Sequence, residues 1–296
     1  MGREGLRAGW RLALYLIMGT AIFLLLALGL RVIAGRYARQ PLWSELFAEI
    51  AVLAAALAAA WIMSRIEKRS VGVYGLPARS AFGKLFFAGA VWGLLGITAL
   101  LLIMRGIGVF SFGGLALHGL RIWRFAAFWG ALFLVVGFTE EFVFRGYTQY
   151  TLAQGIGFWP SALLFSLIFG GIHLGNPGEA WIGAVAAALI GLFFCFTLWR
   201  TGSLWFAVGL HGAWDWGESY LYSVPDSGGM VPGHLMRPSF HGSRWLTGGT
   251  VGPEGSVLVF VVIAVFFVAF DRAYREVKFG KTSAAPLSPT ARLPLP

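Results

Sequence analysis

Charged residues are scarce in this sequence. Asp, Glu, Lys and Arg make up 12% of its 296 residues, whereas 58% are hydrophobic, and an average soluble domain carries about twice that charged fraction. A chain with so few charges cannot cover the surface of a soluble globule. Its charges also lie between long apolar stretches, as in proteins whose solvent is lipid. The composition therefore excludes a soluble globular protein and predicts one that crosses the membrane several times.

Cysteine is almost absent, and acidic residues are outnumbered. Cys195 is the only cysteine, which excludes a disulfide framework and a C-x-x-C metal site and leaves no evident thiol nucleophile. The chain has 23 Lys and Arg against 13 Asp and Glu, a formal net charge of +10. In a membrane protein such an excess is typical of loops beside anionic lipid headgroups. We therefore expect the lipid bilayer, and no nucleic acid, as a partner.

Long apolar runs occupy most of the chain, and a transmembrane helix needs about 20 such residues. Six spans are expected at 12–30, 85–104, 159–174, 180–199, 203–222 and 255–270. Two more are expected if their helices include charged residues. One of these enters near Leu42 and ends at position 64, and the other runs from position 125 through Glu140 and Arg145. The sequence thus predicts an all-α polytopic membrane protein with about eight transmembrane helices.

The distribution of Lys and Arg predicts the orientation of these helices. If the N-terminus is cytoplasmic, 15 of the 23 Lys and Arg lie on the cytoplasmic side and 8 on the far side. Cytoplasmic loops carry the excess of basic residues in membrane proteins. The first span is too long for the apolar part of a signal peptide and has no clear cleavage site, so we expect an uncleaved anchor. The prediction is a multi-pass plasma membrane protein with both termini in the cytoplasm.

Ionisable residues inside the expected spans are candidates for function, because a charge near the bilayer centre costs roughly 2.5–3.5 kcal/mol on insertion scales. Glu141 and Arg145 are four residues apart and can pair on one helix face, which leaves Glu140 without a counter-ion on its own helix. The other ionisable residues inside the expected spans are His173, four residues after Phe169, and the three residues His211, Asp215 and Glu218, whose spacing forms one polar stripe along a helix.

Each of these residues alone has a plainer explanation, since a single His in a span usually makes a hydrogen bond between helices and a Glu–Arg pair usually stabilises packing. Together they supply a free carboxylate, two histidines and an acceptor, which can activate water and stabilise an oxyanion. We expect the other histidines, His118, His234 and His241, to be solvated loop residues.

Three motifs carry a family resemblance. They are E-E-x-x-x-R at 140–145, F-x-x-x-H at 169–173 and H-x-x-x-D at 211–215. In this order, each inside an apolar span, they resemble the CAAX protease and bacteriocin-processing family of intramembrane endopeptidases, also called the CPBP or Abi family, which includes the type II CAAX prenyl endopeptidases. The motifs cover about residues 122–222.

The resemblance implies an eight-helix fold with a polar cavity open to one membrane face. It implies that Glu140 and His173 activate the attacking water, that His211 and the residue at 215 stabilise the oxyanion, and that Glu141 and Arg145 brace the site. Asp215 departs from the Asn that is usual in the prenyl-protein enzymes. An ionised Asp cannot donate a hydrogen bond to an oxyanion, so it is either protonated or orients His211. Counted from the expected helix ends, His173 lies roughly 10 Å deeper than Glu140 and His211.

Several alternatives stay open. No histidine begins an H-E-x-x-H motif, which excludes site-2-type zinc proteases, and the aspartyl and rhomboid motifs are absent as well. A proton-coupled transporter can also place Glu, His and Asp at the midplane, but we find no internal repeat. A zinc-dependent form of the same protease would use Glu140, His173 and His211 as ligands. We expect no required cofactor and a peptide or membrane protein as substrate.

These inferences divide the chain into five parts. Residues 1–121 form an N-terminal three-helix membrane region, and residues 122–222 form the catalytic core. Residues 223–254 form an extracytoplasmic loop rich in Gly, Pro and Ser, residues 255–278 hold the last transmembrane helix, and residues 279–296 form a disordered Pro-rich tail.

Overall fold

A computed structural model of the chain describes residues 6–33 and 41–280. Of the expected tail, positions 281–296 lie outside the described residues. The α-helices of the described part are α1 (Ala8–Ile33), α2 (Pro41–Ile66), α3 (Lys84–Gly106), α4 (Leu120–Arg145), α5 (Tyr147–Ile156), α6 (Phe158–His173), α7 (Trp181–Thr201), α8 (Trp205–Asp215), α9 (Arg244–Thr247) and α10 (Val259–Ala273).

Other elements are short. A π-helix (Trp216–Leu221) continues α8, and 3-10 turns lie at Val71–Tyr74, Ala78–Ser80 and Pro253–Gly255. Strands β1 (Phe110–Ser111) and β2 (Ser239–Phe240) pair antiparallel.

Each of the eight expected spans coincides with a helix. Within the described residues, five helices are long and apolar enough to cross a membrane: Ala8–Val32, Trp43–Ile66, Lys84–Gly106, Leu120–Ile156 and Trp181–Thr201. The other three are shorter, since α6 has 16 residues, α8 has 11 before its π-helical continuation, and α10 has 15. The all-α, polytopic membrane fold predicted from the sequence is confirmed.

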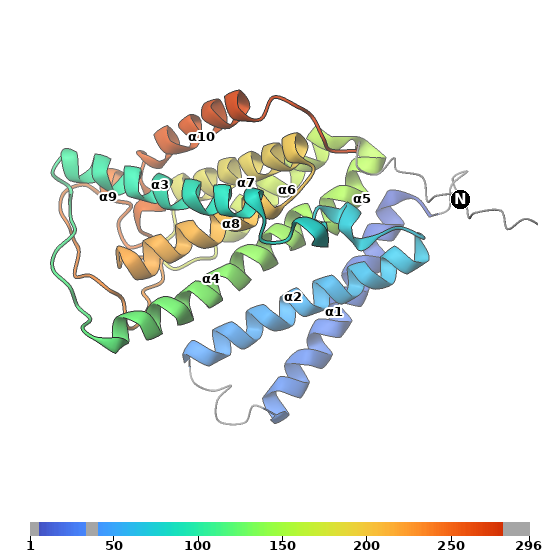
Figure 1. The fold of residues 1–296 in the computed structure, drawn as a ribbon, viewed down its shortest axis with the longest axis horizontal. Helices are drawn as coiled ribbons and strands as arrows, with labels where there is room; N and C mark the ends of the chain where they lie inside the picture. Colours follow the sequence, from blue (N-terminus) through green and yellow to red (C-terminus); the bar gives the residue numbers. More distant parts are fainter. Residues whose placement is uncertain (1–5, 34–40, 281–296) are drawn as a thin grey trace, which may run out of the picture.

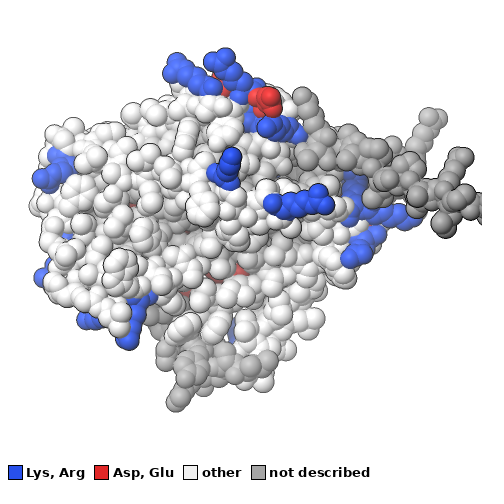
Figure 2. All heavy atoms as spheres, viewed as in Figure 1, with Lys and Arg blue, Asp and Glu red and all other residues white. Residues whose placement is uncertain are grey.

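Large apolar side chains face outward over this helical bundle. Leu25 of α1, Leu95 of α3 and Leu167 of α6 are 70%, 62% and 58% exposed, and contiguous exposure of such residues marks a membrane-facing surface. In Figure 2, Lys and Arg lie at the left edge and toward the upper and right-hand parts of the visible face, and the surface between them is largely white. This distribution fits a lipid-facing belt between two polar ends.

Helix α8 lies in the middle of the bundle, between α3 and α4 (Figure 1). Glycines allow this close packing. A Cβ on Gly93 of α3 would lie 2.2 Å from the carbonyl oxygen of Leu210, and one on Gly137 of α4 would lie 2.9 Å from the backbone nitrogen of Gly212. Small residues of this kind let helix backbones approach closely in membrane proteins. The helix that carries His211 is therefore fixed from two sides.

Helix α5 accounts for the depth difference expected from the sequence. It continues beyond Arg145 by ten residues, about 15 Å at 1.5 Å per residue, and α6 starts near its far end and packs back along it. Helix α6 thus begins farther out than the end of α4. Because α6 has 16 residues, about 24 Å, its end at His173 returns about 9 Å past the end of α4, close to the level of Glu140.

Residues 223–254, which we call the cap loop, return to the helix ends. Strand β2 of this loop pairs with β1, which follows α3, and the backbone N–H of Leu235 donates to the carbonyl of Tyr220 at 3.0 Å. The expected extracytoplasmic loop therefore packs onto the bundle. At the other end of the fold, Phe279 packs against Phe158 and its N–H donates to the carbonyl of Trp199 at 3.1 Å.

Candidate active site

A cavity of about 530 Å³ opens within the bundle. Helices α2, α4, α6, α7, α8 and α10 line it together with the cap loop. The residues of the three motifs that face it are Glu140, Phe169, His173, His211 and Asp215. Segments separated by tens of residues in the sequence thus present their polar side chains to one space.

His211 lies at the centre of a group of carboxylates. Its Nε2 is 3.5 Å from Oε2 of Glu140 and 3.6 Å from Oδ2 of Asp215, and its Nδ1 donates to Oε1 of Glu141 at 3.0 Å. The Glu140 side chain keeps 31% exposure toward the cavity, whereas that of Asp215 keeps 9%. Glu140 lacks a partner on its own helix, as expected, but a histidine from α8 lies beside it.

Glu141 and Arg145 form the expected pair. Nη1 of Arg145 donates to Oε1 of Glu141 at 3.2 Å, and both side chains are fully buried. The guanidinium carbon lies 4.4 Å from the ring centroid of Phe169, a cation–π distance. Gly191 of α7 leaves room for this group, since a Cβ there would lie 2.4 Å from Nη2. One carboxylate oxygen of Glu141 thus receives both Arg145 and His211, which orients the histidine.

His173 ends α6 beside Phe169. Its Nδ1 lies 2.7 Å from the carbonyl oxygen of Phe169, which can only accept, so Nδ1 carries the proton and donates. Nε2 is therefore the acceptor of the neutral ring. The Phe169 ring also packs 4.6 Å from that of His173, and this pairing holds the imidazole in place.

The π-helix changes the expected polar stripe. A wider helical turn after Asp215 brings Ser219 to the cavity wall, and Glu218 lies fully buried behind it. Oε2 of Glu218 accepts from the indole N–H of Trp214 at 2.7 Å. Sequence spacing alone assumes an unbroken α-helix and so places Glu218 on the same face as His211.

Five carboxylates of the cavity were missed in the sequence analysis, and one of them is Glu179, in the turn before α7. Glu45 and Glu49 come from α2, where a helix entering at position 42 sets them four residues apart on one face. Asp226 and Glu254 come from the two ends of the cap loop, and no periodic pattern connects them to the helices. The loop histidines have the expected places away from the cavity, with His118 and His241 exposed and His234 half-buried.

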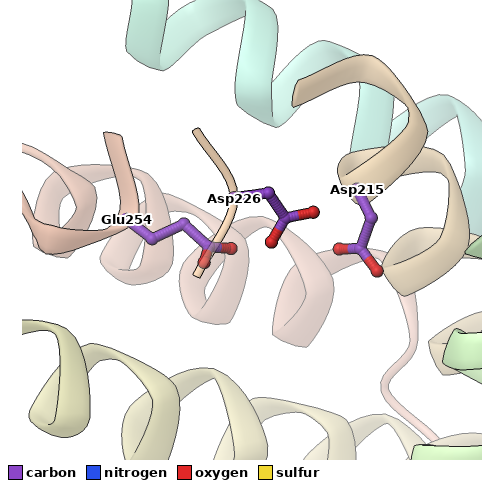
Figure 3. A group of neighbouring side chains, drawn as sticks. All are labelled: Asp215, Asp226 and Glu254. Atoms are coloured by element: carbon purple, nitrogen blue, oxygen red, sulfur yellow. The ribbon is translucent and has the colours of Figure 1, made fainter. Parts of the chain in front are cut away.

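Asp226 and Glu254 lie close to Asp215 (Figure 3). One carboxylate oxygen from each of the three lies within 4.8 Å of the others. Burial raises the pKa of Asp226 to about 6, although a hydrogen bond from Ser219 opposes this rise. Burial and the nearby Asp226 charge raise the pKa of Glu254 to about 8. Burial and Asp226 outweigh the opposing charge of His211, so Glu254 is mostly protonated at pH 7.

Among the described residues, this trio is the group of metal-ligating side chains gathered within that distance. The expected zinc ligands, Glu140, His173 and His211, line the same cavity without meeting that distance. Their imidazoles do donate Nδ1–H to a carbonyl and a carboxylate, an arrangement that also orients histidine ligands of zinc.

Comparison with known families agrees with the motifs. Residues 122–217 match the family described as type II CAAX prenyl endopeptidase Rce1-like, and this match confirms the predicted resemblance. It includes all three motifs but leaves out α1, α2, α3, the whole cap loop and α10. No curated protein and no solved structure matches the chain.

Proposed function

We propose that this chain, whose residues 122–217 match the type II CAAX prenyl endopeptidase Rce1-like family, is an intramembrane endopeptidase. It hydrolyses a peptide bond in or beside the membrane, in a peptide or membrane protein. The observation that carries this proposal is the convergence of Glu140, His173 and His211 on one cavity from three different helices. The cavity is large enough for an extended peptide segment, since small-molecule sites span about 300–1,000 Å³.

Glu140 and His173 activate water in this mechanism. Glu140 is the more exposed acid beside His211 and accepts a proton from the water as its oxygen attacks the scissile carbonyl. The neutral His173 offers Nε2 as an acceptor to hold that water. When the C–N bond breaks, the proton returns to the leaving amine.

His211 stabilises the oxyanion. Glu141 fixes its Nδ1–H, so Nε2 faces the cavity, where a protonated imidazole donates to the developing charge. Asp215 and Glu140 lie on either side of Nε2 and favour the protonated ring. Asp215 therefore acts through His211 as a positioning residue.

The test compares Glu140→Gln with wild type. The amide keeps the shape of the side chain but accepts no proton, and loss of a general base costs about 10²–10⁴ in rate. Mass spectrometry of N-termini in the membrane fraction identifies proteins that are cut with wild type and persist uncut with Glu140→Gln. The matched control is Glu276→Gln, whose side chain is 80% exposed. Equal cleavage by Glu140→Gln, or equal loss in both variants, refutes the proposal.

Two alternatives predict other results. A zinc-dependent protease loses activity with a chelator selective for transition metals and contains stoichiometric zinc. A proton-coupled transporter moves protons across proteoliposomes and leaves no cleavage product. We expect cleavage that resists such a chelator, with no proton flux.

A further inference from the structure

The cavity has a marked imbalance of charge. Its described lining contains neither Lys nor Arg, although the chain has 23 of them. It contains seven of the 13 acidic residues: Glu45, Glu49, Glu140, Glu179, Asp215, Asp226 and Glu254. In Figure 2, the red atoms near the centre of the visible face are recessed among white ones. Negative charge is therefore concentrated inside a protein of net charge +10.

Three of these carboxylates converge at the mouth formed by the cap loop. The carboxyl groups of Asp226 and Asp215 point toward each other, and that of Glu254 points toward Asp226 (Figure 3). Two of the three carboxylates accept a hydrogen bond from a serine hydroxyl: Ser219 donates to Asp226 at 2.9 Å, and Ser227 donates to Glu254 at 3.4 Å. The charged neighbours are His211, 3.6 Å from Asp215, and the acids Glu140 and Glu179.

Glu218 supplies an independent sign that a positive group belongs here. Its side chain is fully buried, and its Oε1 has no hydrogen-bond partner among the described residues. The charges that act on it are those of Glu254, Asp226 and Asp215. The indole N–H of Trp214 lies between Glu218 and Glu254 and acts on both. A buried carboxylate oxygen without a partner is costly, and the three acids of the trio are near enough for their charges to add to this cost.

We infer that a calcium ion binds between Asp215, Asp226 and Glu254, with Glu218 behind it. The ligands are carboxylate oxygens, which select hard cations over zinc. Two oxygens on opposite sides of Ca²⁺ lie about 4.6–5.2 Å apart, and on Mg²⁺ about 4.2 Å. The trio's oxygens, within 4.8 Å of one another, are close enough to share one ion, and a site made of several protein carboxylates suits Ca²⁺ better than Mg²⁺, which keeps most of its waters.

Binding links separate parts of the fold. Asp226 and Glu254 lie at opposite ends of the cap loop, whereas Asp215 lies on α8 beside His211. The ion joins these three points and fixes the cap loop over the cavity. This site is distinct from the Glu140, His173 and His211 set, and its existence does not depend on the proposed protease activity.

The first experiment is calcium titration of the purified full-length protein in detergent. We expect calorimetry to give a dissociation constant below about 1 mM, the range of extracellular calcium modules, and Mg²⁺ to bind at least tenfold more weakly. Tb³⁺, a luminescent substitute for Ca²⁺, should be sensitised by the indole of Trp214. Trp214→Phe should remove most of that luminescence while Ca²⁺ still binds.

The variants are Asp226→Asn and Glu254→Gln, which keep the shape of the side chains and remove one charge each. We expect each to weaken Ca²⁺ binding at least tenfold. Glu45→Gln is the matched control, because Glu45 lines the same cavity outside the trio, and its affinity should change by less than about threefold. Ca²⁺ should raise the melting temperature of wild type but not that of the double variant.

The apo proteins separate a binding defect from a folding defect. Without a bound ion the neighbouring carboxylates repel one another, and each variant removes part of this repulsion. Both variants should therefore melt in EDTA at or above the melting temperature of wild type. Wild type that binds neither Ca²⁺ nor Tb³⁺ up to 5 mM at pH 8, a free concentration about five times the limit expected for such sites, overturns the inference. Binding that is unchanged in the double variant, or tighter for Mg²⁺, also overturns it.

Discussion

At the scale of single residues, the site depends on how one imidazole is held. Nδ1 of His211 donates to a buried carboxylate that also pairs with Arg145, while Nε2 lies between Glu140 and Asp215. Breaking a buried ion pair by removing one partner costs about 3–5 kcal/mol. The Glu141–Arg145 pair therefore fixes the position of His211 while contributing no reacting atom.

Asp215 gives a sharp test of this arrangement. In Asp215→Asn the amide keeps the shape and gains a donor, so we expect activity to be retained or raised when Ca²⁺ is saturating. Asp215→Leu removes the polar contact to His211 and should lose about 10²–10³ in rate, as for loss of one oxyanion-type contact. The measurement is turnover of the cleaved protein by both variants. If Asp215 instead served a zinc site, Asp215→Asn would lose metal affinity by about 10–100-fold and regain activity with added zinc.

At the scale of elements, the positions of the helices follow from where glycine permits contact. Helices α3 and α8 meet at Gly93, and the same α8 carries His211 and Asp215. A shift of this contact moves the site even though Gly93 touches no catalytic group.

Alanine at two glycines of α3 tests this point. Gly93→Ala places a Cβ 2.2 Å from a backbone oxygen of α8, so we expect lower thermal stability and at least tenfold lower turnover. Gly106→Ala is the control, since Gly106 is the last residue of α3 and a Cβ there meets nothing within 4 Å. Melting temperature and cleavage rate are measured for both. Equal behaviour of the two variants would contradict the role of this crossing.

The sequence predicted where helices lie along the chain better than how far each helix is displaced along its neighbours in the bundle. Apolar runs predicted a helix at each of the eight expected positions because lipid requires long apolar helices, and five of the described helices are long and apolar enough to cross a membrane. Helix α5 was not predicted because polar residues such as Gln149 and Thr151 interrupt the apolar pattern that identifies a membrane helix, although both are buried. The π-helix escaped because helical spacing assumes 3.6 residues per turn. Asp226 and Glu254 escaped because contacts between a loop and a helix leave no periodic pattern.

At the scale of the whole molecule, positive and negative side chains lie in different places. Basic residues lie toward the ends of the bundle (Figure 2), and the acids gather within the cavity. Helix α3 separates the two ends, since its 23 residues span about 34 Å. Ser70 lies before its start, and Ser243 lies in the cap loop, which pairs with the strand after its end. The two serines therefore lie near opposite ends of α3, and we expect them on opposite sides of the membrane.

Cysteine labelling at these serines tests the predicted orientation. Cys195 is fully buried, and replacing it by Ala gives a background without other thiols. The 15 to 8 distribution of basic residues predicts that Ser70→Cys and Ser80→Cys react with an impermeant maleimide only after the cells are opened. Ser243→Cys should react in intact cells. The reverse pattern would invert the orientation and place the mouth formed by the cap loop on the cytoplasmic side, where free calcium is scarce.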